Sequence, residues 1–238
     1  MNKKLCITLI VLLICLSDIC FIKLYKGISE DKRQTQQFES IAVAIDEAEN
    51  GEDKFSSLYQ QNNDFVGWIS IPNTRIDYPV VQNKSNPDYY LNHNFNKECS
   101  RFGVPFVQEN CGIETSDNII VYGHNMRNKT MFNELVKYED IGFYAEHNII
   151  YFDTENKERD YVIIAVFKTV ANSGNGFAFN NFVEFNDEEE FDIFIDNCKS
   201  LALYETGVSA KYGDKLLTLC TCEYSREDGR LIVLAKKV

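Results

Sequence analysis

The sequence predicts a mainly β protein whose strands close, or nearly close, into a barrel. About eight short segments are rich in β-branched and aromatic residues, and turn residues separate them. Few segments with helical periodicity lie between these strands. We expect closure because it removes the exposed strand edges along which β proteins associate.

The predicted strands follow a polar N-terminal segment and are recognised by the alternation of their side chains. Pro72-Asn73 and the run Asn83–Pro87 supply turn chemistry between the first strands. Tyr161–Val170 is a long and apolar member of the set. The strands are expected at residues 66–71, 76–81, 104–108, 119–123, 149–152, 161–170, 215–222 and 230–235.

A helix is predicted at Asn186–Ala202, before the last two strands, because its apolar residues recur with helical spacing. Asn186 is expected to cap the first turn, with Glu189 at the capping-box position. Cys198 falls on the apolar face and is expected in the core. A shorter helix of one or two turns is predicted at Met131–Tyr138.

The N-terminal residues 27–62 are predicted to form a helical appendage to the barrel. This segment is polar and helix-permissive, and Phe38, Ile41 and Ile45 recur at helical spacing. Asn50-Gly51 is expected to divide it into two helices. The barrel domain itself is predicted at residues 63–238.

Residues 1–26 are predicted to form an N-terminal membrane anchor. Lysines flank an apolar run, Leu5–Ile22, whose length as a helix is about 27 Å, close to the thickness of the bilayer core. A cleaved signal peptide is the alternative, but it would need a shorter apolar region and an Ala-x-Ala-like cleavage site. The residues before Cys15 and Cys20 do not suit lipid attachment. An uncleaved anchor is therefore favoured, with the domain facing outward.

The composition indicates a folded, acidic protein. Hydrophobic residues make up 45% of the chain and aromatic residues 13%, enough for a buried core. The formal net charge is −12, and residues 27–238 are more acidic still because four lysines lie in the first 26 residues. Such a surface repels nucleic acid and anionic headgroups, so neither is an expected partner.

Five cysteines lie outside the predicted anchor, and their pattern excludes two common uses. Their odd number and loose spacing do not resemble the disulfide framework of a small secreted domain. Cys220-x-Cys222 is not the Cys-x2-Cys pattern of a zinc site, and no histidine pair accompanies it. We therefore expect no metal and no cofactor.

Three residues at strand edges point to catalysis by a thiol. The segment Thr218–Cys222 ends an apolar strand on a cysteine, and Arg230 lies at the start of the next strand. Far upstream, another apolar strand ends at Gly123-His124. A cysteine, a histidine and an arginine are the groups needed for acyl transfer through a thioester. Taken alone, a cysteine at the end of such a strand is more often part of the core.

The same residues resemble the motifs of the sortases, membrane-anchored cysteine transpeptidases of Gram-positive bacteria, and in particular class B. Thr218–Cys222 fits the Thr-Leu-x-Thr-Cys signature of that family. Gly123-His124 and Gly229-Arg230 fit its histidine and its arginine. Further matches, within a resemblance that covers about residues 30–238, are Phe65–Ile69, Ile76–Val81 and Tyr89–Asn92.

The resemblance implies a closed eight-stranded sortase barrel with N-terminal helices and an additional helix before the cysteine strand. It implies cleavage of a cell-wall sorting signal after threonine, with Cys222 as nucleophile, His124 as general acid and base, and Arg230 as oxyanion stabiliser. The implied partners are secreted proteins with a C-terminal sorting signal and an amine of peptidoglycan, or of a pilin subunit. The implied location is the cell membrane, with the catalytic domain outside.

Leu91, Cys220, Thr221 and Tyr224 are candidates for the wall of the substrate groove, although a purely structural role suits each of them equally well. Cys220 faces the same side of its strand as Cys222, and a disulfide between residues two apart on one strand has poor geometry.

Two other functions are compatible with parts of the sequence. A papain-like endopeptidase of peptidoglycan is disfavoured because its cysteine precedes its histidine, whereas here the histidine comes first. A non-catalytic binding module on a membrane stalk would leave the thiol without a chemical role.

Overall fold

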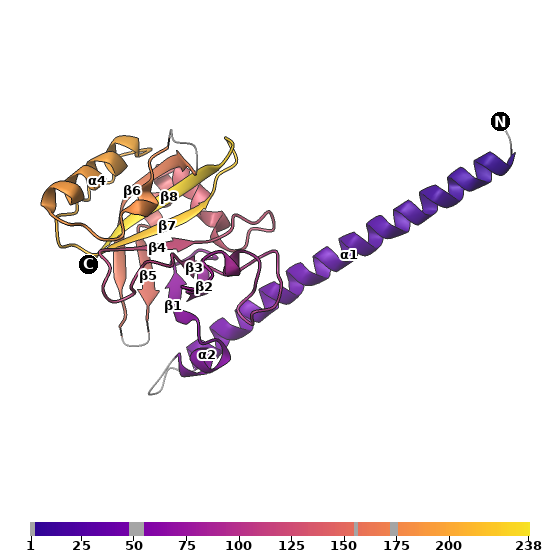
Figure 1. The fold of residues 1–238 in the computed structure, drawn as a ribbon, viewed down its shortest axis with the longest axis horizontal. Helices are drawn as coiled ribbons and strands as arrows, with labels where there is room; N and C mark the ends of the chain where they lie inside the picture. Colours follow the sequence, from indigo (N-terminus) through magenta and orange to yellow (C-terminus); the bar gives the residue numbers. More distant parts are fainter. Residues whose placement is uncertain (1–2, 48–54, 155–156, 172–175) are drawn as a thin grey trace. The chain divides into compact units, whose positions relative to one another are not determined.

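The computed structural model describes residues 3–47, 55–154, 157–171 and 176–238. The chain divides into two compact units, Met1–Ala44 and Ile45–Val238. Figure 1 shows the N-terminal helix and the β-barrel that make up these units.

The N-terminal unit is formed by a helix, α1 (Lys3–Glu47), whose last residues belong to the second unit. Its sequence contains no proline and a single glycine, Gly27, so nothing in it breaks a helix strongly. The predicted boundary between anchor and appendage, after residue 26, falls inside α1 and stays a prediction. Among the described residues, the structure contains no helix whose length and apolar character suit it to cross a membrane. The predicted break at Asn50-Gly51 lies outside the described residues.

The second unit contains a short helix, α2 (Ser56–Gln61), followed by a closed barrel of eight strands in the order β1-β2-β3-β4-β7-β8-β6-β5. This confirms the fold class predicted from the sequence. The β2–β3 and β4–β7 pairs are parallel, and the other neighbours are antiparallel. The strands are β1 (Phe65–Ser70), β2 (Asp77–Val81), β3 (Phe106–Val107), β4 (Asn118–Tyr122), β5 (Ile149–Asp153), β6 (Asp160–Val170), β7 (Leu216–Cys222) and β8 (Gly229–Lys237).

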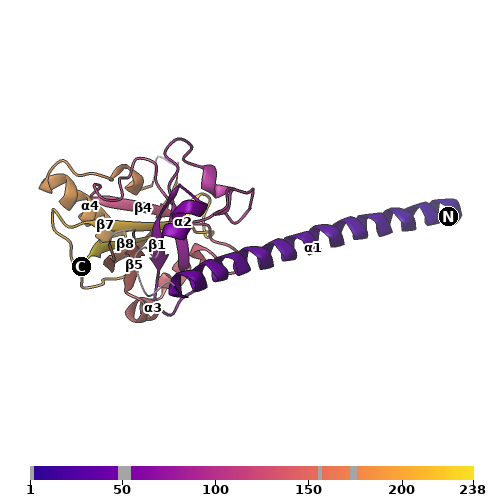
Figure 2. The ribbon, with the colours of Figure 1, turned by 90° about the horizontal axis from the view of Figure 1, so that it is seen from below.

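The strands β4, β7 and β8 run side by side through the barrel (Figures 1 and 2). Six of the seven residues of β7 are buried, and Cys222 at its end is half-buried. A strand buried on both faces is expected to be a nearly continuous apolar run, as β7 and β8 are. This packing fixes the register of β7, which ends at the candidate site, and of β8, which begins there.

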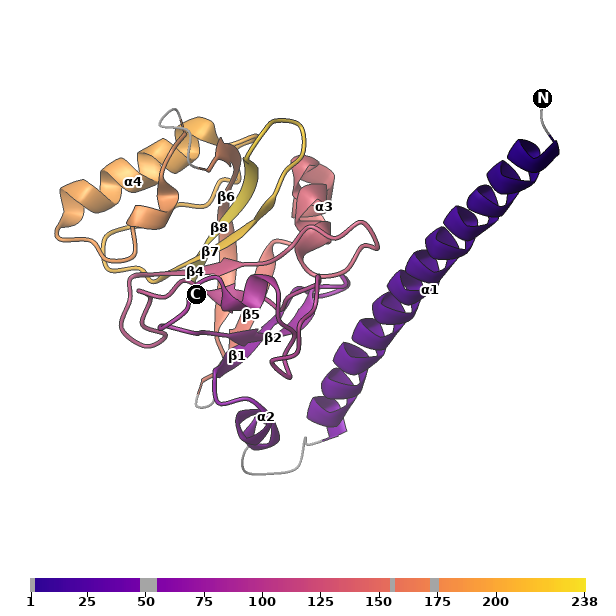
Figure 3. The same ribbon diagram turned by 45° about the vertical axis from the view of Figure 1, so that its right-hand side comes forward.

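Short helices connect the strands. They are η1 (Tyr89–Leu91), η2 (Phe132–Glu139), α3 (Ile141–Glu146), η3 (Phe179–Asn181) and α4 (Glu188–Leu201). The short helix predicted after His124 is present as η2, which is a 3-10 helix. Figure 3 shows α4 beside β6, which it contacts.

The first turn of α4 differs from the prediction. Asp187, not Asn186, is the N-cap, and its side chain accepts a hydrogen bond from the Glu190 N–H at 2.9 Å. Glu190, not Glu189, reaches back and accepts from the Asn186 N–H at 2.8 Å. The prediction was wrong by one residue because both positions offer a capping side chain and an acid three residues on. Cys198 is buried, as predicted.

Candidate active site

The register of β7 and β8 brings Cys222 and Arg230 together. Cys222 is the last residue of β7, and Arg230 is its partner on β8. The turn between the strands is closed by a hydrogen bond from the Glu223 N–H to the Gly229 carbonyl at 2.9 Å. A β-carbon at Gly229 would lie 2.4 Å from the Glu223 carbonyl oxygen, so the close approach requires glycine. The main-chain hydrogen bonds between β7 and β8 therefore place Cys222 and Arg230 opposite each other.

The neighbouring strand β4 carries His124 to the same end of the barrel. Because β4 is parallel to β7, with Tyr122 opposite Cys220, both strands end at one edge. The Gly123 N–H continues the ladder by donating to the Cys220 carbonyl at 3.0 Å. A β-carbon at Gly123 would lie 2.5 Å from the Phe132 ring, so glycine lets the chain pass over η2 at this point.

A cavity of about 1210 Å³ opens at this edge. His124, Cys222 and Arg230, the three predicted catalytic residues, all line it. Of the predicted groove residues, Leu91, Cys220 and Thr221 also line it, and Tyr224 does not. Aromatic and amide side chains complete the wall, among them Phe106, Gln108, Tyr122, Phe177 and Asn180. Asp88 and Glu109 line it as well, so the wall combines apolar and aromatic side chains with amides and two carboxylates.

His124 is oriented by a backbone carbonyl. Its Nε2 lies 2.8 Å from the carbonyl oxygen of Leu91, the last residue of η1. A carbonyl only accepts, so Nε2 carries the hydrogen and Nδ1 of the neutral ring keeps a lone pair. Leu91 was predicted as a groove residue, and it reaches the histidine through its main chain.

Asn125 was not singled out in the sequence, although it follows the histidine directly. Its Nδ2 donates to the Cys222 carbonyl at 2.8 Å, and its Oδ1 accepts from Asn133 Nδ2 at 2.6 Å. Its own carbonyl accepts from the Tyr224 hydroxyl at 3.1 Å. Asn125 thus ties the end of β7 to the segment that carries His124, across 97 residues of sequence.

Cys220 and Cys222 lie in different environments. Cys220 is 1% exposed, and burial raises the pKa of its thiol, an effect that the nearby Arg230 guanidinium only partly offsets. Cys222 is half-buried. Since the thiolate is the nucleophilic form of cysteine, burial disfavours Cys220 as a competing nucleophile.

The remaining candidates have distinct positions. Thr221 is buried, and its hydroxyl donates to the Gly123 carbonyl at 2.8 Å, which links β7 to the end of β4. Tyr224 is 73% exposed in the turn after β7. Both stay predictions as groove residues.

Arg230 is half-buried, and its Nη1 donates to the Gly229 carbonyl at 2.9 Å. Within the described parts of the chain, no carboxylate forms an ion pair with it. Among the residues that the structure describes, the guanidinium thus lines the cavity without a direct carboxylate partner. Arg226, the other arginine of this region, is exposed in the turn.

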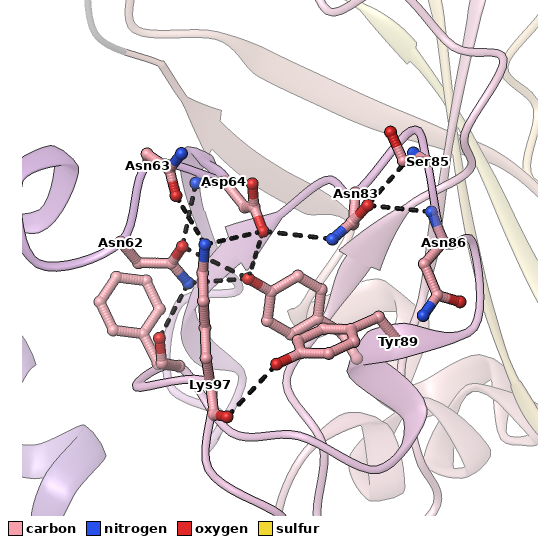
Figure 4. A network of polar contacts seen from close by, with 10 residues as sticks. Asn62, Asn63, Asp64, Asn83, Ser85, Asn86, Tyr89 and Lys97 are labelled. Carbon is pink, nitrogen blue, oxygen red and sulfur yellow. Dashed lines mark hydrogen bonds and ion pairs between the residues drawn. The ribbon is translucent and has the colours of Figure 1, made fainter.

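A polar network holds the loop that supplies the Leu91 carbonyl (Figure 4). We call residues 86–104 the η1 loop. The Asn62 Nδ2 donates to the Tyr90 hydroxyl at 3.0 Å and to the Phe95 carbonyl at 2.8 Å. The Tyr90 hydroxyl donates to Asp64 Oδ2 at 2.8 Å, and Lys97 Nζ lies 3.1 Å from the same oxygen. Tyr90 and Asn62 are both buried, so their polar atoms depend on these partners.

The sequence matches the Sortase domain family over residues 69–238. The chain is 30% identical to Sortase B of Staphylococcus aureus over an alignment of 247 residues, which covers 99% of this chain and 98% of that protein. It is 34% identical to Sortase B of Listeria monocytogenes over 194 residues, covering 79% of this chain and 76% of that protein.

Solved structures with the same fold carry the same family name. The structure of a Staphylococcus aureus sortase B–substrate complex superimposes with a TM-score of 0.80 at 29% identity, covering 88% of this chain and 98% of that chain. Sortase B of Clostridium perfringens gives a TM-score of 0.70 at 34% identity, covering 76% and 98%. A sortase B structure complexed with triglycine gives 0.79 at 30% identity, covering 88% and 99%.

Proposed function

This chain belongs to the class B sortases, which makes it a cysteine transpeptidase, and we propose that it cleaves a cell-wall sorting signal after threonine and transfers the protein to an amine of peptidoglycan. The observation that supports this most directly is the common cavity lined by Cys222, Arg230 and His124. Two of these residues are register partners on neighbouring strands, and the third follows a strand parallel to one of them.

In the proposed reaction, the Cys222 thiolate attacks the carbonyl carbon of the substrate threonine. The peptide bond after threonine breaks, and a thioester between Cys222 and the threonine carbonyl forms. His124 donates a proton to the leaving amine, and it later accepts one from the incoming amine. Because Nε2 of His124 donates to the Leu91 carbonyl, we propose that Nδ1 exchanges these protons.

Arg230 is proposed to stabilise the negative charge that develops on the threonine carbonyl oxygen. Its guanidinium is always charged and presents donors in a fixed plane, which suits an oxyanion and the backbone of an extended substrate. The absence of a carboxylate partner for Arg230 among the described residues supports this role, since a paired guanidinium would offer less of its charge to the substrate.

An amine is proposed as the second substrate because it resolves the thioester by aminolysis, so that the net reaction is transpeptidation. Two of the similar structures are described as complexes, one with a substrate and one with triglycine. For this chain, we propose secreted proteins with a C-terminal sorting signal as donors. A cross-bridge amine of peptidoglycan, or an amine of a pilin subunit, is the proposed acceptor.

Residues 1–26 are proposed to anchor the enzyme to the cell membrane, with the catalytic domain on the outer side. The support for this comes from the sequence, where lysines flank the apolar run Leu5–Ile22. Residues 27–62 would then connect the anchor to the catalytic domain at residues 63–238. Fractionation of cells that produce the full chain or a version lacking residues 1–26 tests this, because the shortened chain should leave the membrane fraction.

The function is tested with the full chain and a panel of fluorogenic peptides. These peptides vary the positions around Asn/Ser/Pro-Pro-x-Thr-Gly/Asn and are incubated with and without triglycine. The proposal expects cleavage at the threonine bond that requires Cys222, and a product that carries the added amine. Cleavage lost in Cys220→Ala but retained in Cys222→Ala would reassign the nucleophile. No turnover and no labelling of Cys222 by an electrophile would reject the enzymatic role.

A further inference from the structure

A second cysteine–histidine pair lies on the η1 loop, outside the cavity. Cys99 Sγ is 3.7 Å from His93 Nε2, within hydrogen-bonding distance for sulfur. Neither residue lines the cavity that contains Cys222. Cys99 is exposed, and it is the one exposed cysteine among the described residues of the unit Ile45–Val238, since Cys111, Cys198 and Cys220 are buried and Cys222 is half-buried.

The backbone places these two side chains opposite each other. His93 and Cys99 form an antiparallel bridge within a small hairpin. The flanking hydrogen bonds run from the Asn94 N–H to the Glu98 carbonyl at 2.9 Å and from the Ser100 N–H to the Asn92 carbonyl at 2.8 Å. His93 and Cys99 are thus a non-hydrogen-bonded pair, the arrangement that brings cross-strand side chains closest. Lys97, with a φ of 63°, makes the turn.

The His93 ring is held in the tautomer that a base requires. Its Nδ1 lies 2.7 Å from the Tyr89 carbonyl, so Nδ1 carries the hydrogen and Nε2 presents a lone pair to the thiol. The ring stacks on the Tyr89 ring with centroids 3.9 Å apart and planes 6° apart. Tyr89 is itself held, because its hydroxyl donates to the Lys97 carbonyl at 3.3 Å (Figure 4).

We propose that Cys99 and His93 form a site for thiol–disulfide exchange with low-molecular-weight disulfides. His93 Nε2 accepts the proton of the Cys99 thiol, and the resulting thiolate attacks one sulfur of the disulfide. The S–S bond of the small molecule breaks, and a mixed disulfide with Cys99 forms. The departing sulfur takes the proton from the imidazolium and leaves as a thiol. Cys99 is oxidised, and one sulfur of the reagent is reduced.

Such a site has two requirements, and Cys99 meets both. Outside the cavity, no other described cysteine of the unit Ile45–Val238 does so. The thiol is exposed to a reagent in solution, and a base of fixed orientation contacts it. Cys111 lacks the first requirement, and burial raises the pKa of its thiol to about 11. Among the described cysteines of the unit Ile45–Val238, thiol–disulfide exchange should therefore favour Cys99, apart from reaction at Cys222 itself.

The test uses the full chain and glutathione disulfide at about pH 7. Adducts on each cysteine are followed over time by acid quenching and peptide mapping with mass spectrometry. In His93→Gln, adduct formation at Cys99 is expected to slow by about tenfold, because glutamine cannot take the proton. Adduct formation at Cys222 should stay unchanged in the same samples.

His147→Gln is the matched control. The His147 ring makes similar contacts, with Nδ1 3.0 Å from the Pro72 carbonyl and its centroid 4.3 Å from that of Phe143, but no thiol contact is described for it. The rate at Cys99 should be the same in this variant as in the wild type. Equal rates at Cys99 in the wild type and in His93→Gln would overturn the proposal.

A measurement without any variant guards against a His93→Gln protein that fails to fold. The wild-type rate at Cys99 is compared in buffer and in denaturing urea, which separates His93 from the thiol. Faster reaction in the folded protein is expected. A folded rate equal to or below the unfolded rate would show that the histidine does not activate Cys99, and the proposal would fall.

Discussion

Cys222 and Arg230 lie opposite each other on paired strands, whereas His124 is oriented by a carbonyl of the η1 loop. The β7–β8 side is set by main-chain hydrogen bonds along a register of seven pairs. The η1-loop side depends on a carbonyl, that of Leu91, whose loop is fastened by the side chains of Asn62, Asp64 and Tyr90.

The two sides should therefore respond differently to substitution. On the strand side, a side chain can be replaced without moving the backbone, so its chemical role can be measured in isolation. On the loop side, a replacement alters both the local stability and the orientation of His124. On the strand side, a substitution should be able to lower activity without lowering stability. On the loop side, a substitution should lower both together.

Replacement of Cys222 by alanine should have the largest effect on activity. We expect a loss of kcat/KM on the order of 10⁴-fold or more, because the thiol forms the covalent intermediate. The midpoint of thermal unfolding should hardly change, because Cys222 ends its strand and is half-buried. Cys220→Ala is the control, with activity within about tenfold and a stability loss of about 1–2 kcal/mol for a buried side chain. A strongly destabilised Cys222→Ala protein would contradict the expectation that activity can be lost on the strand side without a loss of stability.

Arg230→Lys should lower kcat/KM by about 100-fold, because lysine keeps the charge but loses the planar set of donors. The strand register should persist, since the main-chain bonds of β8 do not involve the side chain. Arg226→Lys, in the exposed turn, should leave the peptide-cleavage kinetics unchanged. A loss in Arg226→Lys with little or none in Arg230→Lys would mean that the turn, rather than the strand, supplies the oxyanion contact.

Gly103→Ala should damage stability and activity together. Gly103 has a φ of +59°, and a β-carbon there would lie 2.3 Å from the Tyr90 carbonyl and 3.2 Å from His124 Cδ2. We expect a loss of unfolding free energy of about 2–4 kcal/mol and a lower kcat, as the backbone shifts away from His124.

Gly207→Ala is matched to it, because Gly207 also has a positive φ, +73°, with nothing within 4 Å of the added carbon. It should lose only about 1 kcal/mol and keep full activity. Denaturant unfolding and peptide cleavage measure both quantities. A kcat in Gly103→Ala equal to that of Gly207→Ala would show that the loop does not control His124.

Tyr90→Phe should destabilise the protein by about 1–3 kcal/mol, because removal of the hydroxyl leaves Asn62 without one of its buried partners. Tyr89→Phe is the control, since its hydroxyl makes one exposed contact, to the Lys97 carbonyl, and its loss should stay within about 0.5 kcal/mol. Equal unfolding free energies for the two variants would show that the polar network around Tyr90 does not stabilise the η1 loop.

Glu223→Gln should have the smallest effect, and one that depends on pH. Burial raises the pKa of Glu223, but hydrogen bonds from Ser225 and the charge of Lys168 outweigh it and hold the pKa below its usual value. A carboxyl whose pKa is lowered by folding stabilises the folded state at pH values above its unfolded-state pKa of about 4.3. This contribution to stability is lost as the pH falls through the folded-state pKa.

Denaturation should therefore show wild type more stable than Glu223→Gln by about 1–2 kcal/mol near neutral pH, with the gap closing towards strongly acidic pH. Glu227→Gln, which alters an exposed residue of the same turn, should show no such dependence. If the difference in unfolding free energy between wild type and Glu223→Gln grew on acidification, Glu223 would not be a carboxylate that the folded state stabilises.

The strands and the order of the candidate residues could be read from the sequence because both depend on local patterns. Runs of apolar and β-branched residues predicted β7 and β8, and the motif at their ends named Cys222 and Arg230. The predicted cap of α4 was off by one residue because Asn186 and Asp187 both fit the local rule. Only the packed helix start distinguishes Asp187 as the residue that bonds the Glu190 N–H.

What the sequence alone determined is thus the closed barrel and the placement of Cys222, His124 and Arg230 at its strand ends. Only the tertiary structure decided that the Leu91 carbonyl orients His124, that Asn125 ties down the Cys222 carbonyl, and that Cys99 faces His93. The first two contacts join residues 33 and 97 positions apart, and the third depends on the register of a hairpin. Every residue has a main-chain carbonyl, and partners far apart in the sequence share no local pattern. Residue types therefore cannot predict these contacts, which depend on how the closed barrel brings the segments together.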